Sequence, residues 1–257
     1  MSDGNADGPD TGRTAETGGT SERITITFAV SRTDERDSPK PGAGTRPKAG
    51  HVEHFDVPCD VYTTVLDGLE YIRTRLDSTL VYRHSCHHGS CGTCGMVIND
   101  EPRLACTTNV RALQAEVVKL YPLPMFDRLA DLAVDPTALF AEFPRDADYR
   151  RESEYNKGAR PPEEIEGFER FENCIECGLC VSACPVTSSW LGPAALAAYH
   201  RELEKHPGRE EEILAAVDVD RGVWSCERHL RCSAVCPTGV YPAKHIALLQ
   251  RRAQKNR

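Results

Sequence analysis

One stretch of the chain decides its fold: Cys174-Ile-Glu-Cys177-Gly-Leu-Cys180-Val-Ser-Ala-Cys184-Pro185. Three cysteines two residues apart, then a fourth after three more residues and a proline, are the ligand run of a cubane iron–sulfur cluster. Such a turn directs three thiolates at one cube, while the fourth points toward a second cluster. Zinc is the alternative, but zinc sites usually pair two C-x2-C knuckles and do not end in C-x3-C-P. The stretch therefore predicts an iron–sulfur cluster.

A partner run lies downstream, Cys226-Glu-Arg-His229-Leu-Arg-Cys232-Ser-Ala-Val-Cys236-Pro237, with a histidine at the second cysteine position. In two-cluster ferredoxins the last cysteine of each run serves the other cluster. That crossing predicts a [4Fe–4S] centre held by Cys174, Cys177, Cys180 and Cys236. It leaves three thiolates for the second centre, from Cys184, Cys226 and Cys232.

His229 leaves two interpretations of the second centre open. Three thiolates can hold a [3Fe–4S] cluster whose missing iron corner faces His229. Alternatively, His229 is the fourth ligand of a [4Fe–4S] cluster. We favour the three-iron cluster, because imidazole ligands are unusual in cubanes held by thiolates.

A third ligand run lies nearer the N-terminus, Cys86-His-His-Gly-Ser-Cys91-Gly-Thr-Cys94, and Cys106 follows after eleven residues. The C-x4-C-x2-C spacing with a distant fourth cysteine is that of a plant-type [2Fe–2S] cluster. With four cysteines present, we expect His87 and His88 to face solvent or a partner. Cys59 belongs to none of these runs, and we expect it to be a structural or exposed thiol near a turn.

Hydrophobic periodicity outlines the rest of the chain. It predicts strands near residues 24–30, 52–57, 96–98 and 117–124, and helices near 64–75, 194–204, 210–217 and 242–251. Residues 127–143 are predicted to form helix pieces that join two halves, and the polar stretches 31–50 and 144–163 to form surface loops. We expect a disordered segment at 1–22, a [2Fe–2S] ferredoxin-type domain at 23–126 and a helical two-cluster domain at 127–257.

The composition narrows the function classes. A formal net charge of −8 and a pI of about 5.6 argue against a nucleic-acid surface. No run approaches the roughly 20 apolar residues that a membrane span needs. The twelve cysteines fall in cluster spacings, and no hydrophobic signal or twin arginine lies near Met1, so we expect maturation in a reducing cytoplasm.

The combined pattern resembles the iron–sulfur subunit of succinate dehydrogenase/fumarate reductase over about residues 23–250, with eleven matching ligand positions. Supporting stretches are Tyr121-Pro-Leu-Pro with Asp127, Asp131 and Leu132, and Leu191-Gly-Pro-Ala-Ala with Tyr199. The family often has a histidine directly after the cysteine equivalent to Cys226, where this chain has Glu227.

The resemblance implies an α+β protein with an N-terminal β-grasp domain of plant-type [2Fe–2S] ferredoxin and a C-terminal all-α, ferredoxin-like two-cluster domain. It also implies a [2Fe–2S], [4Fe–4S], [3Fe–4S] relay from an FAD-containing flavoprotein to a quinone. The quinone would lie at the interface with one or more membrane anchor subunits, with haem b as an optional group. Pro185 and Trp190 are candidate quinone contacts, helix packing being the alternative for Trp190. The expected location is the cytoplasmic face of the cell membrane, held there by partners.

The carbon chemistry is expected on another polypeptide. No glycine-rich dinucleotide fingerprint follows a strand, and no cluster of arginines with an acid or base resembles a dicarboxylate site. We therefore expect no catalytic residues in this chain, which would serve as the electron-transfer subunit of an oxidoreductase. Two alternatives remain open: an electron-transfer subunit of another flavoprotein oxidoreductase, of glycolate or glycerol-phosphate type, and a metal-binding module without redox function.

Overall fold

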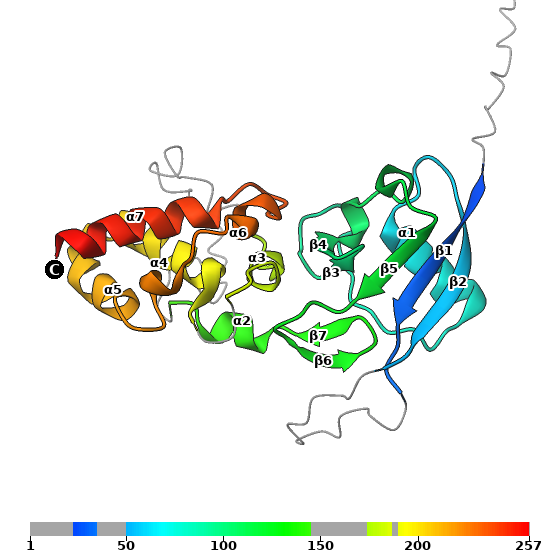
Figure 1. Ribbon diagram of the computed structural model, residues 1–257, viewed down its shortest axis with the longest axis horizontal. Helices are drawn as coiled ribbons and strands as arrows, with labels where there is room; N and C mark the ends of the chain where they lie inside the picture. Colours follow the sequence, from blue (N-terminus) through cyan, green and yellow to red (C-terminus); the bar gives the residue numbers. More distant parts are fainter. Residues whose placement is uncertain (1–22, 35–49, 145–173, 187–189, 257) are drawn as a thin grey trace, which may run out of the picture.

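The computed structural model describes residues 23–34, 50–144, 174–186 and 190–256. Figure 1 shows a sheet domain and a helical domain side by side, joined by a hairpin and a short helix. The predicted disordered segment at 1–22, most of the loop at 31–50 and nearly all of the connection at 144–163 lie outside the described residues. No helix in the described ranges has both the length and the apolar character needed to cross a membrane.

The N-terminal domain is built on a mixed sheet. In the described part of the chain its strands are β1 (Ile24–Ser31), β2 (Val52–Cys59), β3 (Gly95–Ile98), β4 (Glu101–Leu104) and β5 (Val117–Tyr121). Their order is β2-β1-β5-β3-β4, with β1 and β5 parallel at the centre and the other neighbours antiparallel. The β-grasp expectation is confirmed, and the strands predicted from periodicity all form.

Helix α1 (Val65–Tyr71) packs on this sheet. Thr64 and Asp67 begin it with a capping box: the Thr64 hydroxyl accepts from the Asp67 amide, and the Asp67 carboxylate accepts from the Thr64 amide at 2.9 Å. A π-helical turn (Ile72–Leu76) continues it. Gly68 lies inside α1 because a Cβ there would come within 2.4 Å of the Phe28 ring. A larger residue would favour the helix more strongly than glycine does, but this close contact leaves no room for one.

The second domain is helical, as expected. Its helices are α3 (Leu179–Ser182), α4 (Gly192–Lys205), α5 (Glu210–Val217), α6 (Arg231–Ala234) and α7 (Pro242–Lys255). Prolines occupy the first turns of α4 and α7, where a missing amide hydrogen costs nothing. Helices α4 and α7 lie side by side in both views and pack together more extensively than any other helix pair in the described residues.

Residues 127–143 are predicted to form helix pieces, and for the first half of this linking segment the prediction is wrong. Residues Asp127–Ala130 (β6) and Ala133–Asp135 (β7) form a hairpin, and only Thr137–Ala141 (α2) is helical. The cause is tertiary: the buried carboxylate of Asp131, in the turn, accepts hydrogen bonds from the Thr33 and Val81 amides at 2.8 Å each. The hairpin thus contacts the N-terminal domain, while the division at 126/127 stays a prediction.

Arg32 joins segments of the N-terminal domain to the turn of the β6–β7 hairpin. Its side chain is 9% exposed and lies 2.8 Å from Glu53, 2.5 Å from Asp77 and 3.3 Å from Asp131. Hydrogen bonds from Thr79 and Arg32 lower the pKa of Asp77 to about 2. The carboxylate therefore stabilises the fold fully above about pH 4, and this contribution is lost as the pH falls toward 2.

We expect Arg32→Met to lower the free energy of unfolding by about 3 kcal/mol, because it leaves the Asp131 carboxylate buried without its cation. The variant should also lose less stability than the wild type between pH 4 and pH 2, since the pKa of Asp77 returns toward its usual value. Urea unfolding across this pH range measures both effects. The matched control is Arg103→Met, which removes an exposed partner of Glu101 and should cost less than about 1 kcal/mol. Equal losses in the two variants would contradict this role of Arg32.

Candidate metal centres

The first thiol group lies in the loop after the π-helical turn and at the end of β4. It comprises Cys86, Cys91, Cys94 and Cys106. The Cys86 amide donates to the Cys91 sulfur at 3.4 Å, the Gly89 amide donates to the Cys106 sulfur at 3.2 Å, and Cys94 hydrogen-bonds with Cys106. The structure thus brings these four side chains together. Cys106, the fourth, lies in the 3-10 turn Ala105–Thr107 that follows β4.

Backbone amides converge on the Cys86 sulfur of this group. His88, Ser90 and Cys91 donate to it at 3.5, 3.2 and 3.3 Å. These hydrogen bonds, that of His88 first, lower the pKa of the Cys86 thiol to about 6. Burial instead raises the pKa of Cys94 to about 12. The loop is therefore already arranged to stabilise negative charge on a sulfur, which is what a cluster ligand carries.

The two histidines of this loop have other partners. His87 has a positive φ of 63°, and its Nε2 lies 3.0 Å from Nδ1 of His84. His84 in turn lies 3.3 Å from the carboxylate of Glu70. His88 is exposed, and its Nδ1 lies 2.5 Å from the Cys86 carbonyl oxygen. Neither ring is directed at the thiols by these contacts.

The second thiol group lines a cavity among α3, α4 and the start of α7. Its members are Cys174, Cys177, Cys180 and Cys236. Burial raises the pKa of Cys174 to about 12 and of Cys177 to about 11, and that of Cys180 well above its usual value. Two small residues of α4, Ala194 and Ala197, line the same cavity. In the absence of metal Cys174, Cys177 and Cys180 would be protonated, so metal binding must release their protons.

The third thiol group lines a neighbouring cavity, and its members are Cys184, Cys226 and Cys232. Burial, together with charge repulsion from the nearby Cys184 and Cys226, raises the pKa of Cys232 to about 11. Cys236 therefore lies with the first cysteine run and Cys184 with the second. This is the grouping that the crossed ligand pattern predicts, although ligation itself stays a prediction.

His229 is among the residues that line the third cavity. Its Nε2 is 3.0 Å from the carboxylate of Glu227, and its side chain is 45% exposed. The flanking Arg228 and Leu230 both have left-handed backbone, with φ of 60° and 61°. The loop thus turns the imidazole toward Glu227 and solvent.

Trp190 and Pro185 line the same cavity. Trp190 is 5% exposed, and its indole nitrogen is buried without a hydrogen-bond partner in the described residues. Pro185 is exposed. Cys59, by contrast, lies outside all three groups: it is buried on β2, 3.5 Å from the Val57 carbonyl oxygen, and burial raises its pKa to about 11. We therefore assign Cys59 to the core.

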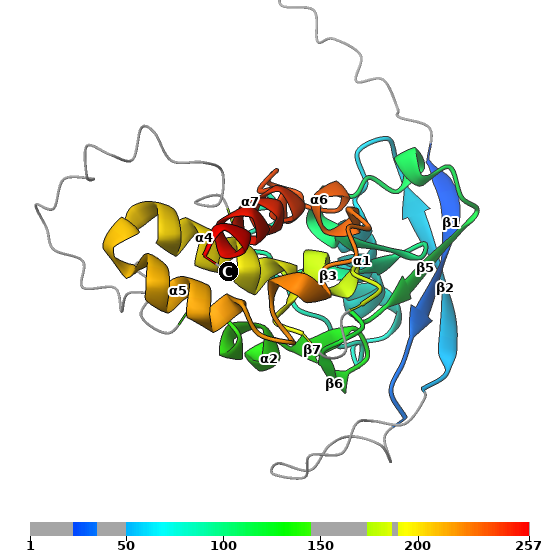
Figure 2. The same ribbon diagram turned by 60° about the vertical axis from the view of Figure 1, so that its left-hand side comes forward.

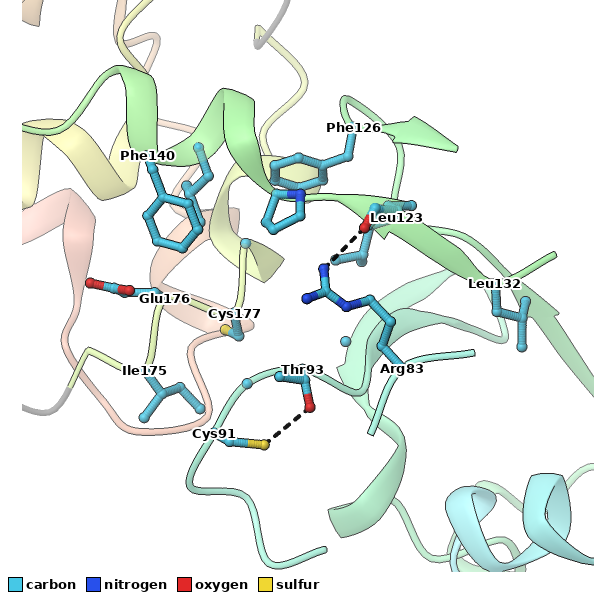
Figure 3. Close-up of a pocket in the computed structure, with 16 residues that line it drawn as sticks. Arg83, Cys91, Thr93, Leu123, Phe126, Leu132, Phe140, Ile175, Glu176 and Cys177 are labelled. Atoms are coloured by element: carbon cyan, nitrogen blue, oxygen red, sulfur yellow. Dashed lines mark hydrogen bonds between the residues drawn. The ribbon is translucent and has the colours of Figure 1, made fainter. Parts of the chain in front are cut away.

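The first and second thiol groups meet at a contact that sequence reasoning missed. A Cβ on Gly92 would lie 2.5 Å from the Ile175 carbonyl oxygen and 2.9 Å from the Cys177 Cα. Figure 3 shows the pocket beside this contact, with Cys91 and Thr93 from one loop and Ile175 and Cys177 from the other. Cys91 and Cys177 thus come from loops in direct backbone contact. A glycine between two ligand cysteines was the available signal.

Comparison with known proteins bears on the whole chain. A family model described as the 2Fe-2S iron-sulfur cluster binding domain matches residues 27–141, and one described as the 4Fe-4S dicluster domain matches residues 170–240. The fumarate reductase iron-sulfur subunit of Mycobacterium tuberculosis is 37% identical over 207 residues, which are 75% of this chain and 81% of that protein. The corresponding subunit of Haemophilus influenzae is 33% identical over 76% of this chain and 84% of that protein.

The chain belongs to the iron–sulfur subunit family of succinate dehydrogenase/fumarate reductase. A solved chain of the Mycobacterium smegmatis Sdh1 complex in the apo form has the same fold, with a TM-score of 0.71 over 92% of this chain and 98% of that chain, at 23% identity. Like its relatives, this iron–sulfur subunit is part of an oxidoreductase complex, and it carries one 2Fe-2S and one 4Fe-4S cluster domain.

The donor sets of this iron–sulfur subunit suit those clusters. Thiolates are the preferred protein ligands of iron–sulfur centres. Each group presents three or four of them to one loop or cavity, and amide donors already point at the Cys86 sulfur of the first.

We expect Gly92→Ala to slow electron transfer between the 2Fe-2S and 4Fe-4S domains several-fold, because the added methyl must separate the two loops. The control is Gly89→Ala, which has the same left-handed backbone strain (φ of +77° against +72°) but meets only the Thr107 side-chain methyl, at 2.9 Å. Rapid reduction followed by freeze-quenched electron paramagnetic resonance measures the rate, with iron content as a check on cluster loading. Equal slowing in both variants would mean that backbone strain, and not the contact, is responsible.

Proposed function

We propose that the chain carries electrons one at a time between an FAD-containing flavoprotein, which holds the dicarboxylate site, and a membrane quinone. The observation that carries this proposal is the continuous series of thiol groups across the molecule. The loop that carries the first group contacts the loop that carries the second where Gly92 lies against Cys177. The second is joined to the third through α3, which carries Cys180 and is followed by Cys184, and through α6, which carries Cys232 and is followed by Cys236.

We assign a [2Fe–2S] cluster to Cys86, Cys91, Cys94 and Cys106. A [4Fe–4S] cluster is assigned to Cys174, Cys177, Cys180 and Cys236, and a [3Fe–4S] cluster to Cys184, Cys226 and Cys232. The three-iron assignment is supported by His229, whose Nε2 is engaged by Glu227 and whose ring is nearly half exposed. An iron ligand would instead be directed into the cavity.

The clusters supply the redox chemistry, and the residues of this chain determine the position and potential of each. Amide donors to the Cys86 sulfur stabilise negative charge there, which favours the reduced state of the first centre. The buried, apolar Ala194 and Ala197 of α4 line the cavity of the second thiol group and lower the polarity around it. Both effects act on potentials without any acid or base from this chain.

Partners are proposed at the two ends of the series. The first thiol group lies in a loop whose His88 is exposed, and we propose that the flavoprotein docks there. At the other end Leu230, 59% exposed, lines the third cavity, and we propose that this end meets the membrane anchor, with or without haem b. The chain would then lie on the cytoplasmic face of the cell membrane.

We propose the quinone site beside the third thiol group, contacted by Pro185 and Trp190. The supporting observation is the buried indole N–H of Trp190, which has no acceptor in the described residues and so could donate to a quinone oxygen. Both residues line the cavity that holds Cys184, Cys226 and Cys232.

The function is tested by isolating the chain with its natural partners and assaying the assembly. We expect succinate-dependent quinone reduction, or fumarate reduction by a reduced quinone, together with a flavin-containing subunit. Activity with glycolate or glycerol phosphate, and none with dicarboxylates, would instead identify the electron-transfer subunit of another flavoprotein oxidoreductase. A colourless, iron-free preparation that binds zinc at the thiols would overturn the redox function altogether.

Replacing His229 by cysteine tests the three-iron assignment. In the oxidised wild type we expect the electron paramagnetic resonance signal of a [3Fe–4S] centre. In His229→Cys the added thiolate should allow a [4Fe–4S] cluster, so that signal is lost and the potential falls, slowing quinone reduction. The matched control is His229→Gln, which removes the imidazole without adding a thiolate and should keep the signal. If the intact, active wild type lacks the signal, His229 is an iron ligand and the assignment is wrong.

A further inference from the structure

A second kind of donor cluster lies between α4 and α7, and none of its members is a cysteine. His200 on α4 and His245 on α7 bring their Nδ1 atoms to 2.9 Å, with the rings at 65°. Both residues are buried, with exposures of 4% and 1%. Glu204 lies one helical turn after His200, and its carboxylate oxygen is 3.6 Å from the His200 Nδ1. One ligand atom from each of the three lies within 4.8 Å of the other two.

The Nδ1 contact restricts the protonation of the pair. A hydrogen bond between two Nδ1 atoms needs one protonated and one unprotonated nitrogen, so at least one ring offers its Nδ1 lone pair inside the cluster. A divalent cation can take the place of that single proton and bind both lone pairs. The simplest alternative is a neutral hydrogen bond between the helices. That alternative does not require the carboxylate, which α4 holds on the same face at the i,i+4 spacing.

We propose that His200, Glu204 and His245 bind a divalent transition-metal ion, most suitably zinc, which joins α4 to α7. Two imidazole nitrogens and one carboxylate oxygen are ligands that zinc accepts, with water in the fourth position. Zinc–nitrogen bonds of about 2.0–2.1 Å in a tetrahedral site separate the two nitrogens by about 3.3 Å. The rings would have to move apart by a few tenths of an ångström. The Glu204 side chain, 42% exposed, provides the entry path from solvent.

The proposed zinc site lies close to the walls of two thiol cavities. Ala197 of α4, three residues before His200, and Pro242 of α7, three residues before His245, both line the cavity of the second thiol group. Ile246, next to His245, lines the cavity of the third. An ion between the helices would therefore fix two walls of the thiol cavities without touching a thiol. The proposal does not depend on the electron-transfer function.

The experiment uses the full chain with its iron–sulfur clusters loaded, in complex with its partners where the assembly requires them. Protein is dialysed against a series of buffered free zinc concentrations, and zinc and iron are counted by mass spectrometry. We expect the wild type to bind one more zinc per chain than His245→Ala. Glu204→Gln, at an exposed position that should not disturb folding, should need at least tenfold more free zinc for the same occupancy. The matched control is Glu211→Gln, an exposed carboxylate on α5 with the same charge change, which should bind zinc as the wild type does.

Thermal unfolding supplies a second measurement. Zinc should raise the unfolding midpoint of the wild type and of Glu211→Gln, because an ion that binds the folded chain stabilises it, and should leave that of Glu204→Gln nearly unchanged. Equal zinc content in the wild type and His245→Ala would overturn the proposal, as would wild-type zinc affinity in Glu204→Gln. Either result would leave a hydrogen-bonded histidine pair. Iron content, counted in the same samples, reports independently on the thiol groups.

Discussion

The close approach of two backbones at Gly92 is the constraint on which the arrangement of the molecule depends. Any side chain there would meet the Ile175 carbonyl and the Cys177 backbone, so the loop of the N-terminal domain can lie against the first cysteine run of the helical domain only with glycine. Residues on both sides adapt to this contact. Gly178 begins α3 with left-handed backbone against the Phe126 ring, and Gly95 packs near Leu123 and Leu179. The two domains therefore meet at their metal-binding loops, and the hairpin β6–β7 connects them at one side (Figure 1).

Burial raises the pKa of the thiols, whereas hydrogen bonds from backbone amides lower it. Which effect is larger differs from one cysteine to another. Burial raises the pKa of Cys94, Cys174 and Cys177, which disfavours isolated thiolates in the interior. Amide donors lower the pKa of Cys86 in the exposed loop. A buried thiolate becomes stable only when a metal compensates its charge, so Cys94, Cys174 and Cys177 depend on a metal for that compensation more than Cys86 does.

Helices α4 and α7 support both thiol cavities of the second domain. Alanines along α4 allow the cysteine loops to approach closely, since larger side chains would fill the cavity. The polar contact between the two helices lies further along them, away from the cysteine runs, where His200 meets His245. The helix pair thus separates an apolar cavity wall near the cysteine runs from a polar contact beyond it. Packing alone would not require two histidines at this buried position.

The sequence by itself predicted the strands, the main helices and the family, because these follow from local periodicity and from the spacing within each ligand run. Alternation of apolar residues predicts β1 and β2, and the ligand runs predict which thiols share a loop. Tertiary structure decided the rest. The hairpin at 127–135 forms because Asp131 is bound by the distant Thr33 and Val81, and no periodicity within the segment reports those partners. In the same way, His200 and His245 are 45 residues apart in the chain, and only the packing of α4 on α7 brings their rings together.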